Sequence, residues 1–186
     1  MQKLLLFSLL SLAQACHAEV SESLVYDYYT AHAEPRRSLF DVLSAASPIR
    51  QKRQIFHGHT NWYVKWTMRW VENPNRSCRL TKFKVDLSGK ILLPKLENAN
   101  ADQQMEFSNY LSELRVHELG HYDIGREAAA AVDKAILALP EMPDCKALEA
   151  RVNELGHTIL RQYLDKELRY DAVTLHGRLQ SAWSGS

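Results

Sequence analysis

Two histidines and a glutamate form the part of the chain best suited to chemistry. His117, Glu118 and His121 belong to the run His-Glu-Leu-Gly-His, in which the two histidines are four residues apart. Residues at this spacing project from one face of a helix, so both imidazoles can bind a single Zn²⁺ ion at about 2.0–2.1 Å. Glu118 follows the first histidine, where its carboxylate can accept a proton from a water molecule at the ion. The motif therefore predicts a zinc hydrolase, with peptide or protein as the expected substrate.

The two histidines share their helix face with apolar residues. This stripe has spacings of three or four and comprises Tyr110, Leu114, His117, His121, Ile124 and Ala128. Histidines in such a stripe point toward the core, and buried imidazoles cost free energy unless both rings find partners. A metal ion would partner both rings, which favours a metal site over a solvated helix face.

A third protein ligand is needed, because catalytic zinc usually has three plus an open position for water. Asp171 and His176 are the leading candidates, and they fall about 140° apart on a regular helix. Both would bind only if the helix ended between them. We expect His176 to be the ligand, because histidine is the softer donor and Gly177 beside it suits a helix end.

Other candidates for the third ligand stay open. Asp171 would either replace His176 or accept a hydrogen bond from a ligand histidine and fix its ring. His57 and His59 are weaker candidates, since loop histidines without partners usually have ordinary polar roles. Residues 153–157 read Asn-Glu-Leu-Gly-His, but asparagine is a poor zinc ligand, so we expect no second metal site there.

The elements expected to position these residues place the chain in the α+β class. Strands are expected at residues 24–29, 60–72, 78–87 and 90–93, with a tight hairpin at Ser88-Gly89 and a short helix over 38–46. Within 60–72, apolar Trp62, Val64, Trp66, Met68 and Trp70 alternate with more polar residues, which predicts one face toward a core.

Two long helices are expected in the second half. The first covers about residues 102–139 and carries the two histidines, and the second begins at Pro143-Asp144 and continues to residue 168 or beyond. The predicted fold is a small antiparallel sheet in the N-terminal half, packed on two long helices, with a zincin-like arrangement.

The first 18 residues have the pattern of a secretory signal peptide. Lys3 gives a positive start, and residues 4–13 form an apolar run too short to span a bilayer. Cleavage is expected after Ala18 or Ala15. Lipid anchoring at Cys16 is less favoured, because the preceding residues fit a lipobox poorly. We therefore expect one exported domain over residues 19–186, secreted or periplasmic and without stable membrane insertion.

The cysteines and the charge balance support an exported protein that does not bind nucleic acid. Cleavage leaves Cys78 and Cys145, an even number that predicts a disulfide worth about 4 kcal/mol, with two free buried thiols as the alternative. The chain has 23 basic and 22 acidic residues, and loss of Lys3 with the signal peptide makes the two numbers equal. A neutral chain gives no electrostatic reason to bind nucleic acid or an anionic membrane surface.

These features resemble a family of bacterial proteins described as predicted secreted zinc-dependent proteases. The resemblance rests on the His117–His121 motif in a long helix, a cysteine in the next loop, the aromatic stretch at 60–66 and Tyr-Asp-x-x-Thr-x-His-Gly near the C-terminus. It spans about residues 22–182. The resemblance implies zinc binding by His117 and His121 and a catalytic role for Glu118.

The predicted mechanism is that of a zinc peptidase. Glu118 would act as general base, and Tyr170 is the candidate second donor to the oxyanion. Two alternatives remain from the sequence. One is a non-catalytic exported module held together by zinc and a disulfide, and the other is a zinc amidase that acts on cell-wall peptides.

Overall fold

The computed structural model describes residues 20–51 and 53–177. The expected signal peptide, its cleavage sites and Cys16 lie outside these residues. Among the described helices, none combines the length and the apolar composition that crossing a membrane requires.

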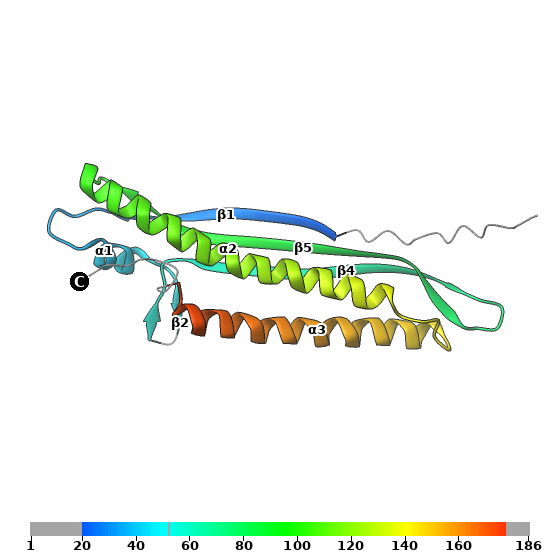
Figure 1. Ribbon diagram of the computed structural model, residues 1–186. Coiled ribbons are helices and arrows are strands. Elements are labelled where there is room, and N and C mark those ends of the chain that lie inside the picture. The colour runs from blue at the N-terminus through cyan, green and yellow to red at the C-terminus, as the bar shows by residue number, and fades with distance from the viewer. Residues whose placement is uncertain (1–19, 52, 178–186) are drawn as a thin grey trace, which may run out of the picture.

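Three long strands form a mixed sheet with β5 in the centre (Figure 1). β5 (Cys78–Glu97) pairs antiparallel with β4 (His59–Glu72) and parallel with β1 (Val20–His32). The expectation of a purely antiparallel sheet is therefore wrong. The segment with α1 (Leu39–Ala46) leads from the end of β1 to the start of β4, so these strands run in opposite directions. β5 lies between β1 and β4, and because these two run in opposite directions, it must be parallel to one of them.

The predicted hairpin at Ser88-Gly89 is also wrong, because β5 continues through these residues. Gly89 is needed for packing rather than for a turn. A Cβ atom at this position would collide with the ring of Tyr122, which packs on the strand from a helix. Glycine inside a strand often marks such a close approach, and the sequence alone does not distinguish it from a turn.

The alternation in β4 is confirmed over most of the strand. Val64, Trp66 and Met68 pack against the main core, as does Trp62. The pairing with β5 shifts between Arg69 and Trp70, and Trp70 beyond this irregularity is 40% exposed. The expectation that Trp70 continues the apolar face is wrong, since a bulge changes the face to which the following side chains point.

Each helix begins at a side chain that satisfies free backbone N–H groups. Ser38 caps α1, Asp144 caps α3 (Cys145–Thr174), and Asn100 forms a capping box with Gln103 at the start of α2 (Ala101–Leu137). These caps lie where the sequence predicts helix starts. A small ribbon of β2 (Arg50–Gln51) and β3 (Gln54–Ile55) completes the described elements.

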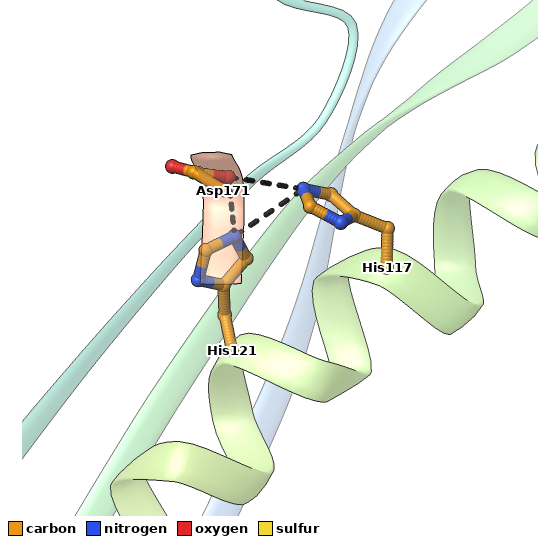
Figure 2. Close-up of side chains that lie close together, drawn as sticks. All are labelled: His117, His121 and Asp171. Atoms are coloured by element: carbon orange, nitrogen blue, oxygen red, sulfur yellow. Dashed lines mark hydrogen bonds and ion pairs between the residues drawn. The ribbon is translucent and has the colours of Figure 1, made fainter. Parts of the chain in front are cut away.

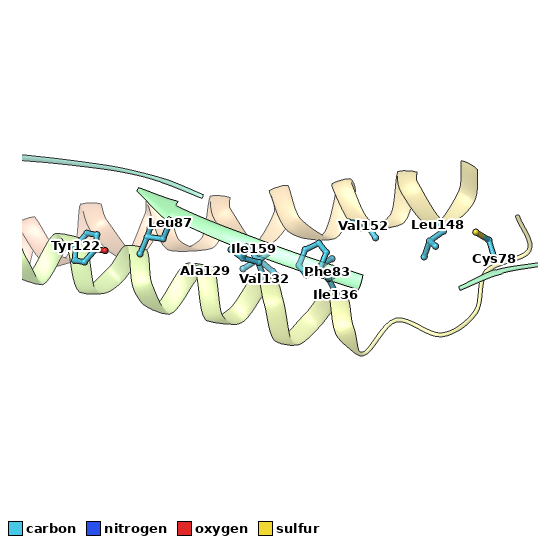
Figure 3. Close-up of a cluster of buried hydrophobic side chains, with 11 residues drawn as sticks. Cys78, Phe83, Leu87, Tyr122, Ala129, Val132, Ile136, Leu148, Val152 and Ile159 are labelled. Atoms are coloured by element: carbon cyan, nitrogen blue, oxygen red, sulfur yellow. The ribbon is translucent and has the colours of Figure 1, made fainter. Parts of the chain in front are cut away.

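The two long helices run side by side along the sheet and enclose the main core (Figures 1 and 3). This core is built from buried side chains of β5, α2 and α3: Cys78, Phe83, Val85, Leu87, Tyr122, Ala129, Val132, Ile136, Leu148, Val152 and Ile159. A second cluster surrounds α1 and includes Phe107 of α2. The predicted disulfide between Cys78 and Cys145 is present and joins the start of β5 to the start of α3.

Candidate metal centre

α2 carries His117, Glu118 and His121 on a rigid part of the fold. Phe107 on the N-terminal side belongs to the α1 cluster, and Tyr122 on the C-terminal side belongs to the main core. His117 is 4% exposed and His121 is 8% exposed. The expectation that these histidines point inward is therefore confirmed.

The two imidazoles and the carboxylate of Asp171 converge on one point (Figure 2). Nε2 of His121 lies 3.3 Å from Nε2 of His117 and 3.1 Å from Oδ1 of Asp171. Nε2 of His117 lies 3.3 Å from the same Oδ1. α3 supplies Asp171, so the group brings together residues separated by about fifty positions in the sequence.

These separations match the ligand set of a tetrahedral zinc ion. Bonds of about 2.0–2.1 Å in a tetrahedron place neighbouring ligand atoms about 3.3 Å apart. The three separations in the structure are 3.1, 3.3 and 3.3 Å. Two imidazoles and one carboxylate are also a donor set that occurs in catalytic zinc sites. The residues present therefore fit zinc.

His176 lies beside this group, whereas Asp171 lies against both histidines. Nδ1 of His176 is 3.4 Å from Oδ1 of Asp171, and its side chain is 45% exposed. The group whose ligand atoms all lie within 4.8 Å of one another comprises His117, His121 and Asp171, among the described residues. The choice of His176 from sequence depended on histidine being the commoner zinc ligand and on Gly177 beside it, and neither feature gives the distance to the two histidines.

The end of α3 explains why Asp171 and His176 lie close together. The helix ends at Thr174, and Leu175 and His176 adopt left-handed backbone angles with φ of 50° and 53°. The backbone N–H of His176 donates to the carbonyl oxygen of Asp171 at 2.9 Å. The chain thus folds back over the last turn, so the two side chains are not held at the separation of a regular helix.

The ionisable side chains of this group shift one another's pKa values. Burial alone would lower the pKa of His121, but the carboxylates of Asp171 and Glu167 outweigh it and raise this pKa to about 10. Burial alone would raise the pKa of Asp171, but the two imidazoles hold it well below its usual range. The carboxylates of Asp171 and Glu167 therefore favour positive charge at His121.

Glu118 points toward the start of β4. Its side chain is 3% exposed, and the hydroxyl of Thr60 donates to Oε2 at 2.6 Å. Burial raises the pKa of Glu118, while the Thr60 hydrogen bond and the neighbouring histidines oppose this rise. Gly58 leaves space for the carboxyl group, because a Cβ atom there would collide with it.

Tyr170 packs directly on both histidines. Its ring stacks on His117 with centroids 5.2 Å apart and an interplanar angle of 10°, and it meets His121 edge to face. Its hydroxyl donates to the carbonyl oxygen of His117 at 3.3 Å. Gly120 makes this approach possible, since a Cβ atom there would collide with the hydroxyl.

The remaining histidine candidates have different surroundings. The His57 ring is buried and lies within hydrogen-bonding distance of Ser44 and Tyr110, at 2.9 Å and 2.6 Å. His57 therefore has two polar partners and does not join the metal group. His59 begins β4 and is likewise outside that group among the residues that the structure describes.

Two contributors to the site were missed from the sequence. Thr60 reads as an ordinary strand residue, and Glu167 reads as a solvated helix residue. The only local signal for Glu167 is that it precedes Asp171 by four positions, which puts both carboxylates on one face of α3. Its contact with His121 depends on how α2 packs against α3.

Fold and site together define an α+β protein in which two buried histidines and a partly buried aspartate lie beside a buried glutamate. The family model described as "Bacterial protein of unknown function (DUF922)" matches residues 26–177, and the chain belongs to this family. The matched range contains every residue of the site. No curated protein and no solved structure matches the chain.

Proposed function

We propose that the protein is an exported zinc-dependent peptidase. The observation that carries this proposal is the convergence of His117, His121 and Asp171 at the edge lengths of a tetrahedral zinc site, next to the buried carboxyl group of Glu118. A structural zinc site is usually closed by four protein ligands, whereas three leave a position for water and substrate. The disulfide supports export, since such bonds persist in oxidising compartments.

Zinc bound by these three residues would polarise the scissile carbonyl group and acidify a water molecule. Glu118 would accept a proton from the attacking water and pass it to the leaving nitrogen. The hydrogen bond from Thr60 fixes the carboxylate so that it needs no reorientation during proton transfer.

Tyr170 is the proposed second donor to the oxyanion. Its ring stacks on His117, and its hydroxyl lies against the backbone of α2 at His117 and Gly120. To act, the hydroxyl must exchange its 3.3 Å hydrogen bond to the His117 carbonyl for the developing oxyanion.

The test compares Glu118→Gln with the zinc-loaded parent on a mixed peptide library. We expect the variant to retain zinc and to lose hydrolysis by about 10²–10⁴-fold, because glutamine keeps the shape but accepts no proton. Glu127→Gln is the matched control, since Glu127 lies on the same helix and is exposed, where it pairs with Lys166. Equal hydrolysis by Glu118→Gln and parent, or a zinc-loaded parent that cleaves neither proteins nor cell-wall peptides, would refute the proposal.

A further inference from the structure

We propose that Glu167, held in place by Trp62, is the positioning residue for the metal ligand His121. This inference rests on the metal site of the proposed function. Oε1 of Glu167 lies 3.3 Å from Nδ1 of His121 and accepts a hydrogen bond of 2.7 Å from Nε1 of Trp62. One carboxylate oxygen therefore joins β4, α2 and α3 at the site.

The two nitrogens of His121 have separate partners. Nε2 faces His117 and Asp171, and Nδ1 faces Glu167. An imidazole that binds a metal through Nε2 carries its hydrogen on Nδ1, where it needs an acceptor. Glu167 is that acceptor. A carboxylate in this role fixes the tautomer and the ring orientation and increases the basicity of the ligand nitrogen.

Trp62 is itself fixed by close packing. Its indole ring lies against Gly125 of α2, where a Cβ atom would be 2.7 Å from Cγ of the ring. Its N–H reaches across to Glu167 of α3. The side chain of Glu167 is 21% exposed, so its rotamer is restricted by these neighbours as well as by the hydrogen bond.

A similar arrangement further along the helices provides an internal comparison. Trp66 of β4 packs into the space at Gly156 and donates from Nε1 to Oδ1 of Asn153 at 3.1 Å. An uncharged amide is therefore sufficient where the indole only needs an acceptor. At Trp62 the acceptor is a partly buried carboxylate, whose desolvation costs free energy unless a donor such as His121 offsets it.

The test measures zinc affinity by competition with a chelator of known affinity. Glu167→Gln keeps an oxygen that can accept from Trp62 but removes the charge, and we expect zinc binding to weaken about 10–100-fold. Trp62→Phe keeps an aromatic ring beside Gly125 and loses the N–H with part of the indole, while Glu167 keeps its charge, so we expect a smaller loss. Trp66→Phe and Glu154→Gln are the controls, because Trp66 donates to Asn153 and Glu154 pairs with Arg151. Both should change affinity less than twofold.

A spectroscopic readout separates positioning from a general effect on the fold. The proton on Nδ1 of His121 should give a downfield NMR signal in the zinc-loaded parent, and this signal should move upfield or exchange faster in Glu167→Gln but not in Trp66→Phe. Unchanged zinc affinity and an unchanged signal in Glu167→Gln would overturn the inference. A parent that binds zinc without cleaving peptides would refute the peptidase and leave this inference standing, whereas a parent that binds no zinc would overturn both.

Discussion

Thr60 places its single hydroxyl donor between two oxygens of Glu118. Its hydroxyl oxygen lies 2.6 Å from Oε2 and 3.0 Å from the backbone carbonyl oxygen of Glu118, and all three atoms are buried in the protein. The edge strand β4 is thereby tied to the helix that carries both histidines. A strand residue with no reactive chemistry of its own thus sets the orientation of the proposed general base.

Removal of the Thr60 hydroxyl should impair turnover without removing the metal. Thr60→Val keeps the shape of the side chain and deletes the donor to the Glu118 carboxylate. Hydrogen bonds to charged groups contribute about 1.5–3 kcal/mol, so we expect kcat to fall about 10–100-fold with zinc content unchanged. Thr67→Val on the exposed face of β4 serves as control. A kcat that is the same in Thr60→Val and in the control would show that this hydrogen bond does not position Glu118.

Tyr170→Phe tests the oxyanion role. Phenylalanine keeps the ring that stacks on His117 and loses only the hydroxyl. Loss of one oxyanion donor lowers kcat by about 10²–10³-fold, and KM and zinc content should stay as in the parent. If kcat is unchanged, Tyr170 supports the histidines through packing alone.

His57 should make the free energy of unfolding depend on pH. Burial lowers its pKa from 6.5 to about 4, so the folded protein keeps the ring neutral where the unfolded chain already takes up a proton. The contribution of His57 is complete above about pH 6.5 and is lost as the pH falls from there toward 4, by roughly 3 kcal/mol at most.

His57→Gln is the variant that isolates this effect. Glutamine offers a donor and an acceptor to Ser44 and Tyr110 and does not titrate. Urea unfolding between pH 4 and 7.5 should give a smaller pH slope for the variant than for the parent. Parallel curves would mean that His57 has an ordinary pKa in the folded protein.

The disulfide should contribute a large part of the stability. Cys78 and Cys145 are 67 positions apart, and closing a loop of this length in the unfolded chain contributes about 4 kcal/mol. The double variant Cys78→Ala, Cys145→Ala should lose about this much free energy of unfolding, measured in urea with zinc removed from both proteins. A loss below about 1 kcal/mol would show that removing the disulfide adds little conformational entropy to the unfolded chain.

Local features of the fold were predictable, whereas the long-range ones, apart from the disulfide, were not. Ser38 and Asp144 indicate helix starts because capping depends on residues within one turn. The parallel pairing of β1 with β5 depends on partners more than sixty positions apart, and no local pattern encodes it. Gly89 was misread for the same reason, since its role depends on Tyr122 of another element.

The residues of the candidate site also divide into those that a local pattern predicts and those that depend on long-range contacts. His117, Glu118 and His121 follow from spacing within one helix. Asp171 and His176 could be named as candidates, but their order depended on where α3 ends and on the left-handed turn at Leu175. Glu167 could not be identified from the sequence, because its contacts with Trp62 and His121 come from two other elements of the fold.

The most direct test is the zinc content of the purified protein and of two variants, measured by mass spectrometry after zinc loading and dialysis. We predict one zinc ion per chain in the parent and in His176→Ala, and almost none in Asp171→Ala, because Asp171 lies within 3.3 Å of both ligand nitrogens. A parent that retains no zinc would contradict the metal centre, and zinc that survives in Asp171→Ala but is lost in His176→Ala would contradict the ligand set.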